Sequence, residues 1–224
     1  MGYSLPSTGI RHNVPMYTPT TFRVTDDARQ QALMRDYPFA VLISADEEGL
    51  QTTHLPFVVE SGRGAHGALL GHMARANPHW RHFDGQREAT VIFTGPHAYI
   101  SPSWYADPHT VPTWNYAAVH GHGCPRVIED KARARSVLEQ LVAEHEAPLD
   151  PPWTMDQAEP NIDKQLDHIV VFELEISRLE GKFKFNQNRS RADRQGVVDA
   201  LAGHDDPLQR AVAQIMQTQL DQDG

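Results

Sequence analysis

The stretch of sequence that decides the fold has three parts: Phe39-Ala-Val-Leu-Ile-Ser44, Asp46-Glu-Glu-Gly49 and the run from Leu50 to Val59. The first segment is apolar and rich in β-branched residues, and the second supplies turn residues. The third returns to strand-forming residues. Together the three segments predict a β-hairpin, so the chain commits early to antiparallel β-structure.

Further strands are expected after this hairpin. They cover residues 68–73, 89–94 and 98–101 (split by Gly95-Pro96), 114–128 (interrupted by Gly121 and Gly123) and 168–179, extended by 182–186. Capping residues and helical spacing of apolar residues predict helices over 25–36, 77–83, 130–145, 190–201 and 207–220. Short strands at close spacing favour a barrel over an open parallel sheet. The expected fold class is α+β and β-rich, with peripheral and C-terminal helices.

Composition supports one domain. The 224 residues are 40% hydrophobic, which is enough for one sizeable core. Residues 1–15 precede a second methionine, Met16, and lack periodicity, so we expect a flexible N-terminal extension followed by a domain over 16–224. No apolar run is long enough to cross a bilayer. Cys124 is the only cysteine and is expected to be a small buried residue, which together with the missing signal peptide predicts a cytoplasmic protein.

Sequence motifs for several kinds of chemistry are missing. There is no Gly-x-Ser-x-Gly elbow, no P-loop and no Gly-x-Gly-x-x-Gly segment, so a Rossmann enzyme is not expected. His120 and His122 would share one face of a strand, but no third ligand lies near them in sequence. We therefore expect a solvated or hydrogen-bonded histidine pair, and no metal site.

Polar and aromatic clusters at strand ends form five ordered blocks. They are His54-Leu-Pro-Phe57, Gly71-His-Met-Ala-Arg-Ala-Asn-Pro78, Phe93-Thr-Gly-Pro-His-Ala-Tyr-Ile-Ser-Pro102, Val111-Pro-Thr-Trp-Asn-Tyr116 and Lys184-Phe-Asn-Gln-Asn-Arg189. Such clusters offer hydroxyl, amide and cationic donors for a phosphate, and flat apolar walls for a ring. In order and spacing they resemble the signature blocks of the PaiB-type FMN-binding negative transcriptional regulators, over nearly the whole chain after residue 15.

That resemblance implies an FMN-binding split β-barrel related to pyridoxamine-phosphate oxidases and flavin reductases. It also implies a homodimer, and a repressor role in sporulation and protease-gene control in bacilli. The candidates for phosphate contact are Thr52, Thr53, His72, Arg75 and Asn77. The candidates for the flavin ring and its polar edge are His54, Leu55, Trp114, Asn115, Tyr116, Lys184, Gln187 and Asn188, with residues 114–116 supplied by the second subunit.

Each candidate also has a purely structural interpretation. Only one of Thr52 and Thr53 can face a cleft, because neighbouring strand residues point to opposite faces. His72, Arg75 and Asn77 suit a helix cap with solvent or carboxylate partners. The aromatic residues suit a core or a dimer interface, and Gln187 and Asn188 suit a turn.

The sequence leaves three functions open, and the third is a cofactor-free dimerisation module. The first is an FMN-binding regulator, and the alternative is a flavin-dependent oxidoreductase acting on a small substrate. The formal net charge of −9 disfavours direct DNA binding. The acidic link Gly203-His-Asp-Asp206 between the last two helices disfavours a helix-turn-helix. We therefore expect DNA contact to be weak or indirect.

Overall fold

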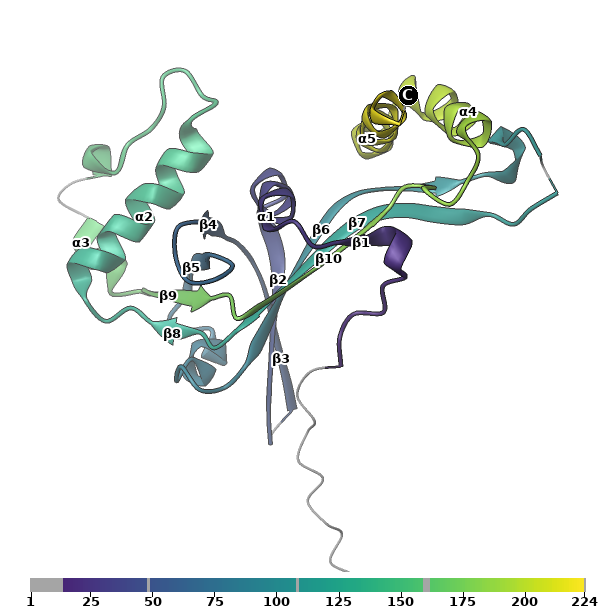
Figure 1. Cartoon of the computed structure of the whole chain (residues 1–224). Coiled ribbons are helices and arrows are strands. Elements are labelled where there is room, and N and C mark those ends of the chain that lie inside the picture. The colour runs from purple at the N-terminus through teal and green to yellow at the C-terminus, as the bar shows by residue number, and fades with distance from the viewer. Residues whose placement is uncertain (1–13, 48, 108, 159–161, 224) are drawn as a thin grey trace, which may run out of the picture.

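The computed structural model describes residues 14–47, 49–107, 109–158 and 162–223 (Figure 1). The predicted extension over 1–15 lies outside the described residues, apart from its last two positions. The strands are β1 (Arg23–Val24), β2 (Phe39–Asp46), β3 (Gly49–Pro56), β4 (Val58–Glu60), β5 (Ala68–Ala74), β6 (Ala89–Ile100), β7 (Thr113–Gly123), β8 (Arg126–Val127), β9 (Ile169–Glu175) and β10 (Arg178–Lys184). The helices are α1 (Asp27–Asp36), α2 (Lys131–Glu146), α3 (Ile162–Leu166), α4 (Arg191–Ala202) and α5 (Pro207–Gln222), with 3₁₀ turns η1 (Thr20–Phe22), η2 (Pro78–His82), η3 (Pro102–Trp104) and η4 (Met155–Ala158).

The predicted hairpin is confirmed as β2 and β3. They pair antiparallel from Phe39 opposite Pro56 to Asp46 opposite Gly49. Gly49 closes the turn with a positive φ of 132°, a conformation that only glycine adopts without strain. The hairpin is one end of a six-stranded sheet with the order β1-β10-β7-β6-β2-β3.

The centre of this sheet is a long hairpin made of β6 and β7. The prediction of two β segments split at Gly95-Pro96 is wrong, because β6 runs without interruption from Ala89 to Ile100. Those two residues form a bulge, seen as a register shift between Thr94 and His97, which keeps the strand paired while it bends. Likewise β7 passes through Gly121 and ends at Gly123.

The second sheet has four strands in the order β4-β5-β9-β8. The predicted strand over 168–179 is divided here, because the chain leaves β9 at Glu175 and enters β10, in the other sheet, at Arg178. At this crossing the main chain packs closely, and a Cβ on Gly123 would collide with the carbonyl oxygen of Glu175. Glycine at this position lets the two sheets meet. Together they form the predicted split β-barrel.

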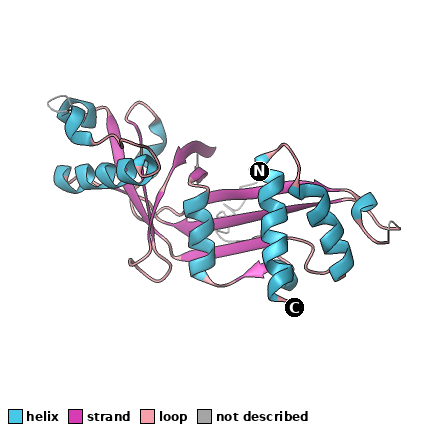
Figure 2. Ribbon diagram, turned by 90° about the horizontal axis from the view of Figure 1, so that it is seen from above, coloured by secondary structure: helices cyan, strands magenta, loops and turns pink. Residues whose placement is uncertain are grey.

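Three of the described helices, α1, α4 and α5, cover one face of the six-stranded sheet. Seen from above, α1, α4 and α5 lie across the strands, while α2 and α3 stand apart against the small sheet (Figure 2). The main core contains Phe57, Phe93 and Phe172, which stack edge to face. A smaller core joins Val137, Leu138 and Leu141 of α2 to Leu70 and Val171 of the small sheet. The predicted helices are therefore confirmed, with the one over 77–83 adopting 3₁₀ geometry.

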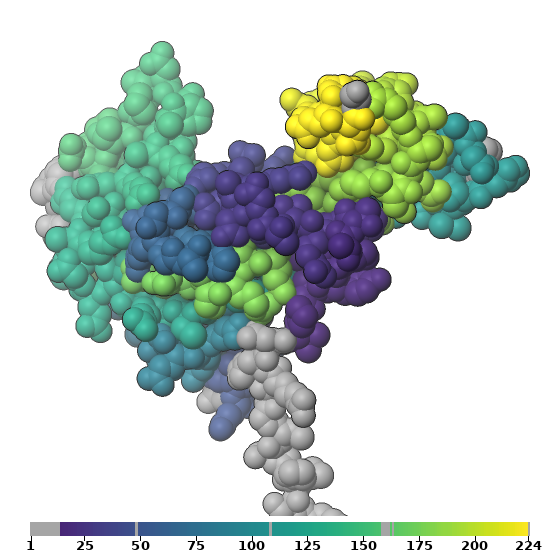
Figure 3. All heavy atoms as spheres, in the orientation of Figure 1, coloured from purple at the N-terminus to yellow at the C-terminus, as the bar shows by residue number. Residues whose placement is uncertain are grey.

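The opposite side of the six-stranded sheet, here called the outer face, carries no helix in the part of the chain that is described. Alternate residues of each strand point to it, and most are partly exposed. They are Phe39, Val41 and Ile43 of β2, Leu50, Thr52 and His54 of β3, Thr90, Ile92, His97 and Tyr99 of β6, Trp114, Tyr116, His120 and His122 of β7, and Arg178, Glu180, Lys182 and Lys184 of β10. In the space-filling view the C-terminal helices form a lobe over the far end of the β6–β7 hairpin (Figure 3). No helix described here has both the length and the apolar character that a bilayer crossing requires.

Candidate functional site

Two of the residues predicted to contact the FMN phosphate, Thr53 and Asn77, lie together where β3 faces η2. The Asn77 amide donates to Thr53 Oγ1 at 3.1 Å, and its side-chain oxygen caps η2 by accepting from the His79 backbone N–H at 3.1 Å. Pro78 occupies the first helical position, where its missing N–H costs nothing. The capping residue and a strand hydroxyl are thereby held together at the edge of the sheet.

A line of hydrogen bonds, here called the relay, continues from Thr53 into the protein. Thr53 Oγ1 lies 2.8 Å from His79 Nδ1, and His79 Nε2 lies 2.9 Å from the hydroxyl of Ser44. The same hydroxyl is 2.8 Å from His82 Nδ1, and His82 Nε2 is 2.9 Å from an oxygen of Asp46. Five polar groups from β2, β3 and η2 are thus joined in one chain.

The donor and acceptor of each hydrogen bond in the relay can be assigned by starting from Asp46 at its acidic end. Ionised Asp46 can only accept, so His82 carries its proton on Nε2 and accepts at Nδ1 from Ser44. The Ser44 oxygen then accepts from His79 Nε2–H, and His79 Nδ1 accepts from the hydroxyl of Thr53. With both rings neutral, each relay group between Thr53 and Asp46 has a donor and an acceptor.

The charge state of His79 agrees with this scheme. Burial, together with a smaller contribution from repulsion by His82, lowers its pKa to about 4. The ring is 1% exposed, so a protonated imidazolium would lose its hydration there. At neutral pH His79 is an uncharged hydrogen-bonding group.

The other predicted phosphate residues do not converge on Thr53. Thr52 points to the outer face. Of the two neighbouring residues predicted to lie against the flavin ring, His54 also points to the outer face, and Leu55 is buried in the core. Arg75 donates from Nε to the carbonyl of Asp167 and from a terminal nitrogen to that of Ile169, both at 2.8 Å. It therefore ties the start of β9 to the loop after β5.

His72, also predicted to contact the phosphate, faces the side of the small sheet that α2 and α3 cover. It lines a cavity of about 600 Å³ between β5, α2 and α3. Its Nδ1 is buried without a hydrogen-bond partner among the described residues, and burial lowers its pKa. The cavity wall is mostly apolar, with Leu138, Trp153 and Met155 prominent.

The residues predicted to contact the flavin ring and its polar edge also lie in separate places. Asn115 is fully buried on the helix side, where its amide donates to Met216 Sδ at 3.3 Å. Gln187 closes its own turn, accepting from Phe185 N–H at 2.7 Å and donating to the Phe183 carbonyl at 2.6 Å. Asn188 is exposed. The turn interpretation thus describes the contacts of Gln187.

The aromatic residues gather on the outer face of the β6–β7 hairpin. The Trp114 ring lies 6.0 Å from Tyr99 and is 53% exposed. Lys182 stands over the Tyr116 ring at 5.3 Å. The ammonium of Lys184 donates to Thr113, and burial, aided by Lys182, lowers the pKa of Lys184. This set combines flat apolar surface with two cations.

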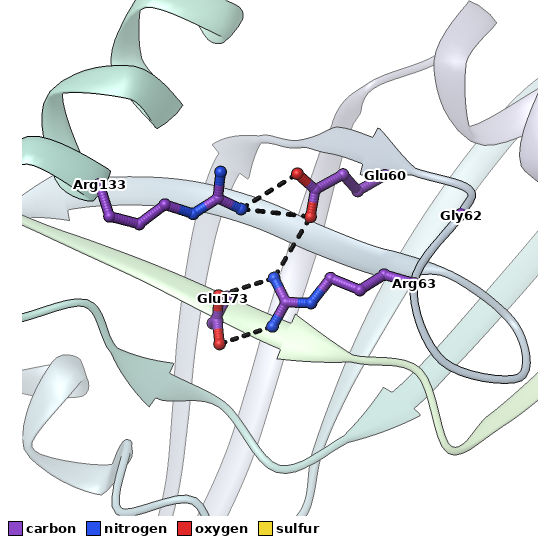
Figure 4. A pocket seen from close by; sticks show the side chains of 5 residues that line it. All are labelled: Glu60, Gly62, Arg63, Arg133 and Glu173. Atoms are coloured by element: carbon purple, nitrogen blue, oxygen red, sulfur yellow. Dashed lines mark hydrogen bonds and ion pairs between the residues drawn. The ribbon is translucent and has the colours of Figure 1, made fainter.

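A charged cleft of about 510 Å³ lies on the small sheet (Figure 4). Arg63 pairs with Glu173 at 2.7 Å and with Glu60 at 3.2 Å, and Arg133 of α2 pairs with Glu60 at 3.0 Å. The hydrogen bond from Arg63 lowers the pKa of Glu173. Because the charges neutralise one another, the cleft anchors α2 to the sheet and offers little to an anion.

Sequence reasoning missed His79, His82, Ser44 and Asp46 as members of a site. One signal was present: His79 and His82 are three residues apart, and in a 3₁₀ turn such residues lie on one side. Ser44 and Asp46 gave no sign, because their roles depend on strand pairing.

The two antiparallel sheets define a protein of the split-barrel class, and comparisons with known proteins identify the family. The family described as "Putative FMN-binding domain" matches residues 16–178. The chain belongs to this family, so the predicted family and its cofactor, FMN, are confirmed.

A relative agrees with the family, and solved structures agree with the fold. Protease synthase and sporulation protein PAI 2 of Bacillus subtilis (strain 168) is 32% identical over 206 residues, covering 92% of this chain and 98% of the relative. The flavocytochrome Anf3 from Azotobacter vinelandii is similar in fold, with a TM-score of 0.59 and 16% identity over 79% of this chain and 74% of its own. An FAD and heme binding protein from Mycobacterium smegmatis has a TM-score of 0.51 and 17% identity over 72% and 73% of the two chains.

Proposed function

We propose that the protein is a homodimeric FMN-binding regulator of the PaiB type, in which two copies of the chain hold each flavin between them. The phosphate end would use Thr53 and Asn77, with Arg75 and Thr52 close in sequence. The ring would use Trp114, Tyr116 and Lys184 of the second copy. FMN supplies one- and two-electron redox chemistry when bound.

The observation that carries this proposal is the separation of the two residue sets in one chain. Thr53 lies in register with Val91 of β6 through β2, whereas Trp114 pairs with Tyr99. About eight residues of strand lie between these two positions, or roughly 25 Å along the sheet. One flavin cannot contact both sets in one chain, but a second copy that packs along the outer face and reaches around β3, the last strand of the sheet, can bring its own Trp114 near Thr53.

The outer face has the character of an interface between subunits. Phe39, Leu50 and Trp114 are 65%, 74% and 53% exposed there, and Val41 and Ile43 lie between the first two. Apolar surface of this extent on one side of a sheet is typical of a region that a partner covers. A second copy would bury these residues and complete both flavin sites.

Regulation through direct DNA contact by the C-terminal helices is not supported. Arg191 donates to the Leu220 carbonyl at 2.9 Å, and Arg194, only 7% exposed, pairs with Asp223 at 2.6 Å. Both side chains fasten α4 to α5, and the charge of the buried Arg194 is already paired with Asp223. We therefore propose that the redox or binding state of FMN, and not operator contact by these helices, carries the regulatory signal.

The relay favours a second candidate, a flavin-dependent oxidoreductase. It connects Thr53, at the proposed phosphate end, to Asp46, which also lies 3.8 Å from Arg87. A hydrogen-bonded chain of two imidazoles and two hydroxyls can pass a proton between its ends. Turnover of NAD(P)H by the FMN-loaded protein with a small electron acceptor would establish this activity, and its absence would leave the regulator.

The test of the proposed function joins FMN affinity to subunit association. Trp114→Ala should weaken FMN binding at least tenfold, measured by flavin fluorescence, while circular dichroism stays unchanged. Trp153→Ala, a partly exposed tryptophan on the α2 side, serves as control and should bind normally. Wild-type protein that binds FMN as a monomer in sedimentation, or Trp114→Ala with unchanged affinity, would refute the shared site.

A further inference from the structure

Three potential metal ligands lie together on the outer face, away from the relay. His120 and His122 are two residues apart on β7, so both rings point to the same side of the sheet. Glu180 of β10 pairs in register with His120 and reaches the same place. One ligand atom from each residue lies within 4.8 Å of the other two.

The His122–Glu180 contact already shows how close these groups are. His122 Nε2 lies 3.2 Å from Glu180 Oε2. The His120 and His122 rings are 6.3 Å apart between centroids and inclined at 65°. Within the described residues, the His120 imidazole makes no hydrogen bond, so a lone pair of this ring is free to bind a cation.

The protonation states suit a metal ion. Burial lowers the pKa of both His120 and His122, so the rings are neutral at pH 7 and can act as ligands. The pKa of Glu180 is also lowered: burial opposes the shift, and hydrogen bonds from the Met16 backbone N–H and from Arg178 outweigh it. The site therefore offers two neutral nitrogens and one carboxylate at neutral pH.

Supporting contacts orient the ligands. His122 Nδ1 lies 2.9 Å from Thr90 Oγ1 and 3.7 Å from Glu88 Oε1, so the nitrogen turned away from Glu180 has partners that fix the ring. Hydrogen-bond partners on the nitrogen that does not bind the metal hold metal-bound histidines in place. Arg178 pairs with Glu180 Oε1 at 2.6 Å, while Oε2 lies 3.2 Å from His122 Nε2 and also accepts from the Met16 backbone N–H at 3.2 Å.

We propose that His120, His122 and Glu180 bind one divalent transition-metal ion per chain, of the class represented by zinc. Two imidazoles and a carboxylate are a ligand set found in sites that keep a further position open for water or a small ligand. The positive charge of Arg178 weakens the site, and the carboxylates of Glu180 and Glu88 offset it. The proposal is independent of where FMN binds.

The test measures metal binding directly. Tag-free, chelator-treated full-length protein is titrated with zinc chloride by calorimetry, and cobalt(II) is added in parallel to record ligand-field absorption. We expect one zinc ion per chain and a cobalt spectrum of a site with low coordination number. His120→Ala removes a ring that has no hydrogen bond to lose, and Glu180→Gln keeps the size of the side chain. Each should weaken zinc binding at least tenfold.

Controls separate this site from the other histidines. His145→Ala changes an exposed histidine on α2, outside the cluster, and should leave the titration unchanged. Circular dichroism and thermal melting in chelator establish that the variants are folded. The proposal is overturned by wild-type protein that binds no zinc, or by His120→Ala and Glu180→Gln both binding zinc like wild type.

Discussion

Ser44→Ala is the sharpest test of the relay, because one hydroxyl joins its two histidines. The residue is 3% exposed, and the rings of His79 and His82 are 1% and 9% exposed. Removing the hydroxyl leaves His79 Nε2–H without an acceptor and His82 Nδ1 without a donor. Alanine fits the strand, and no large cavity forms.

The magnitude follows from those two orphaned groups. Each unsatisfied buried polar group costs about 1–3 kcal/mol, and partial relaxation of the rings reduces the sum, so we expect a loss of about 2–4 kcal/mol in the free energy of unfolding. At a urea dependence of about 2 kcal/mol per molar, the midpoint should fall by about 1–2 M.

The assay is urea unfolding followed by tryptophan fluorescence and circular dichroism at pH 7. Ser136→Ala on the exposed side of α2 is the matched control and should change stability by less than about 0.5 kcal/mol. A Ser44→Ala midpoint that matches the control would show that the histidines do not depend on this hydroxyl, and the relay would have to be abandoned.

Three further outcomes are expected. Because the pKa of His79 is lowered to about 4 from 6.5, the unfolded chain binds more protons between these values, so stability should fall as pH drops from 6.5 towards 4. His79→Gln should lessen that slope in pH-dependent unfolding; an unchanged slope would assign it to other groups. Gly123→Ala should prevent normal folding or cost about 3 kcal/mol or more, because its Cβ collides with the Glu175 carbonyl; a wild-type melting curve would contradict this close packing. Phe172→Ala should cost about 3–5 kcal/mol in urea unfolding, since the ring is fully buried; a loss under about 1 kcal/mol would argue against the packed core.

The fold was predictable wherever local signals decide structure. The β2–β3 hairpin shows its turn residues in the sequence, and Asn77-Pro78 announces the start of η2 by its capping chemistry. Sequence did not show that β6 continues through Gly95-Pro96, because the bulge is stabilised by pairing with β7. The division between β9 and β10 depends likewise on which sheet each strand joins.

The candidate site was predictable only in part, for the same reason. Thr53 and Asn77 stand 24 residues apart and were found because Asn77 lies in one conspicuous block and Thr53 directly precedes another. Glu180 stands 58 residues from His122, and only the pairing of β10 with β7 brings them together. Side-chain direction was the other missing quantity: Asn115 lies between Trp114 and Tyr116 in sequence but faces α5, on the opposite side of the sheet.

The position of β3 at the end of the six-stranded sheet affects how the protein would behave if the subunits of the proposed dimer separated. In the described chain β3 has a strand partner on one side only, so its other margin presents unpaired backbone N–H and C=O groups beside the exposed Leu50. Such a margin recruits further strands from other molecules. Variants that keep the chain monomeric will therefore tend to precipitate or form fibrils at concentrations where the wild type stays in solution.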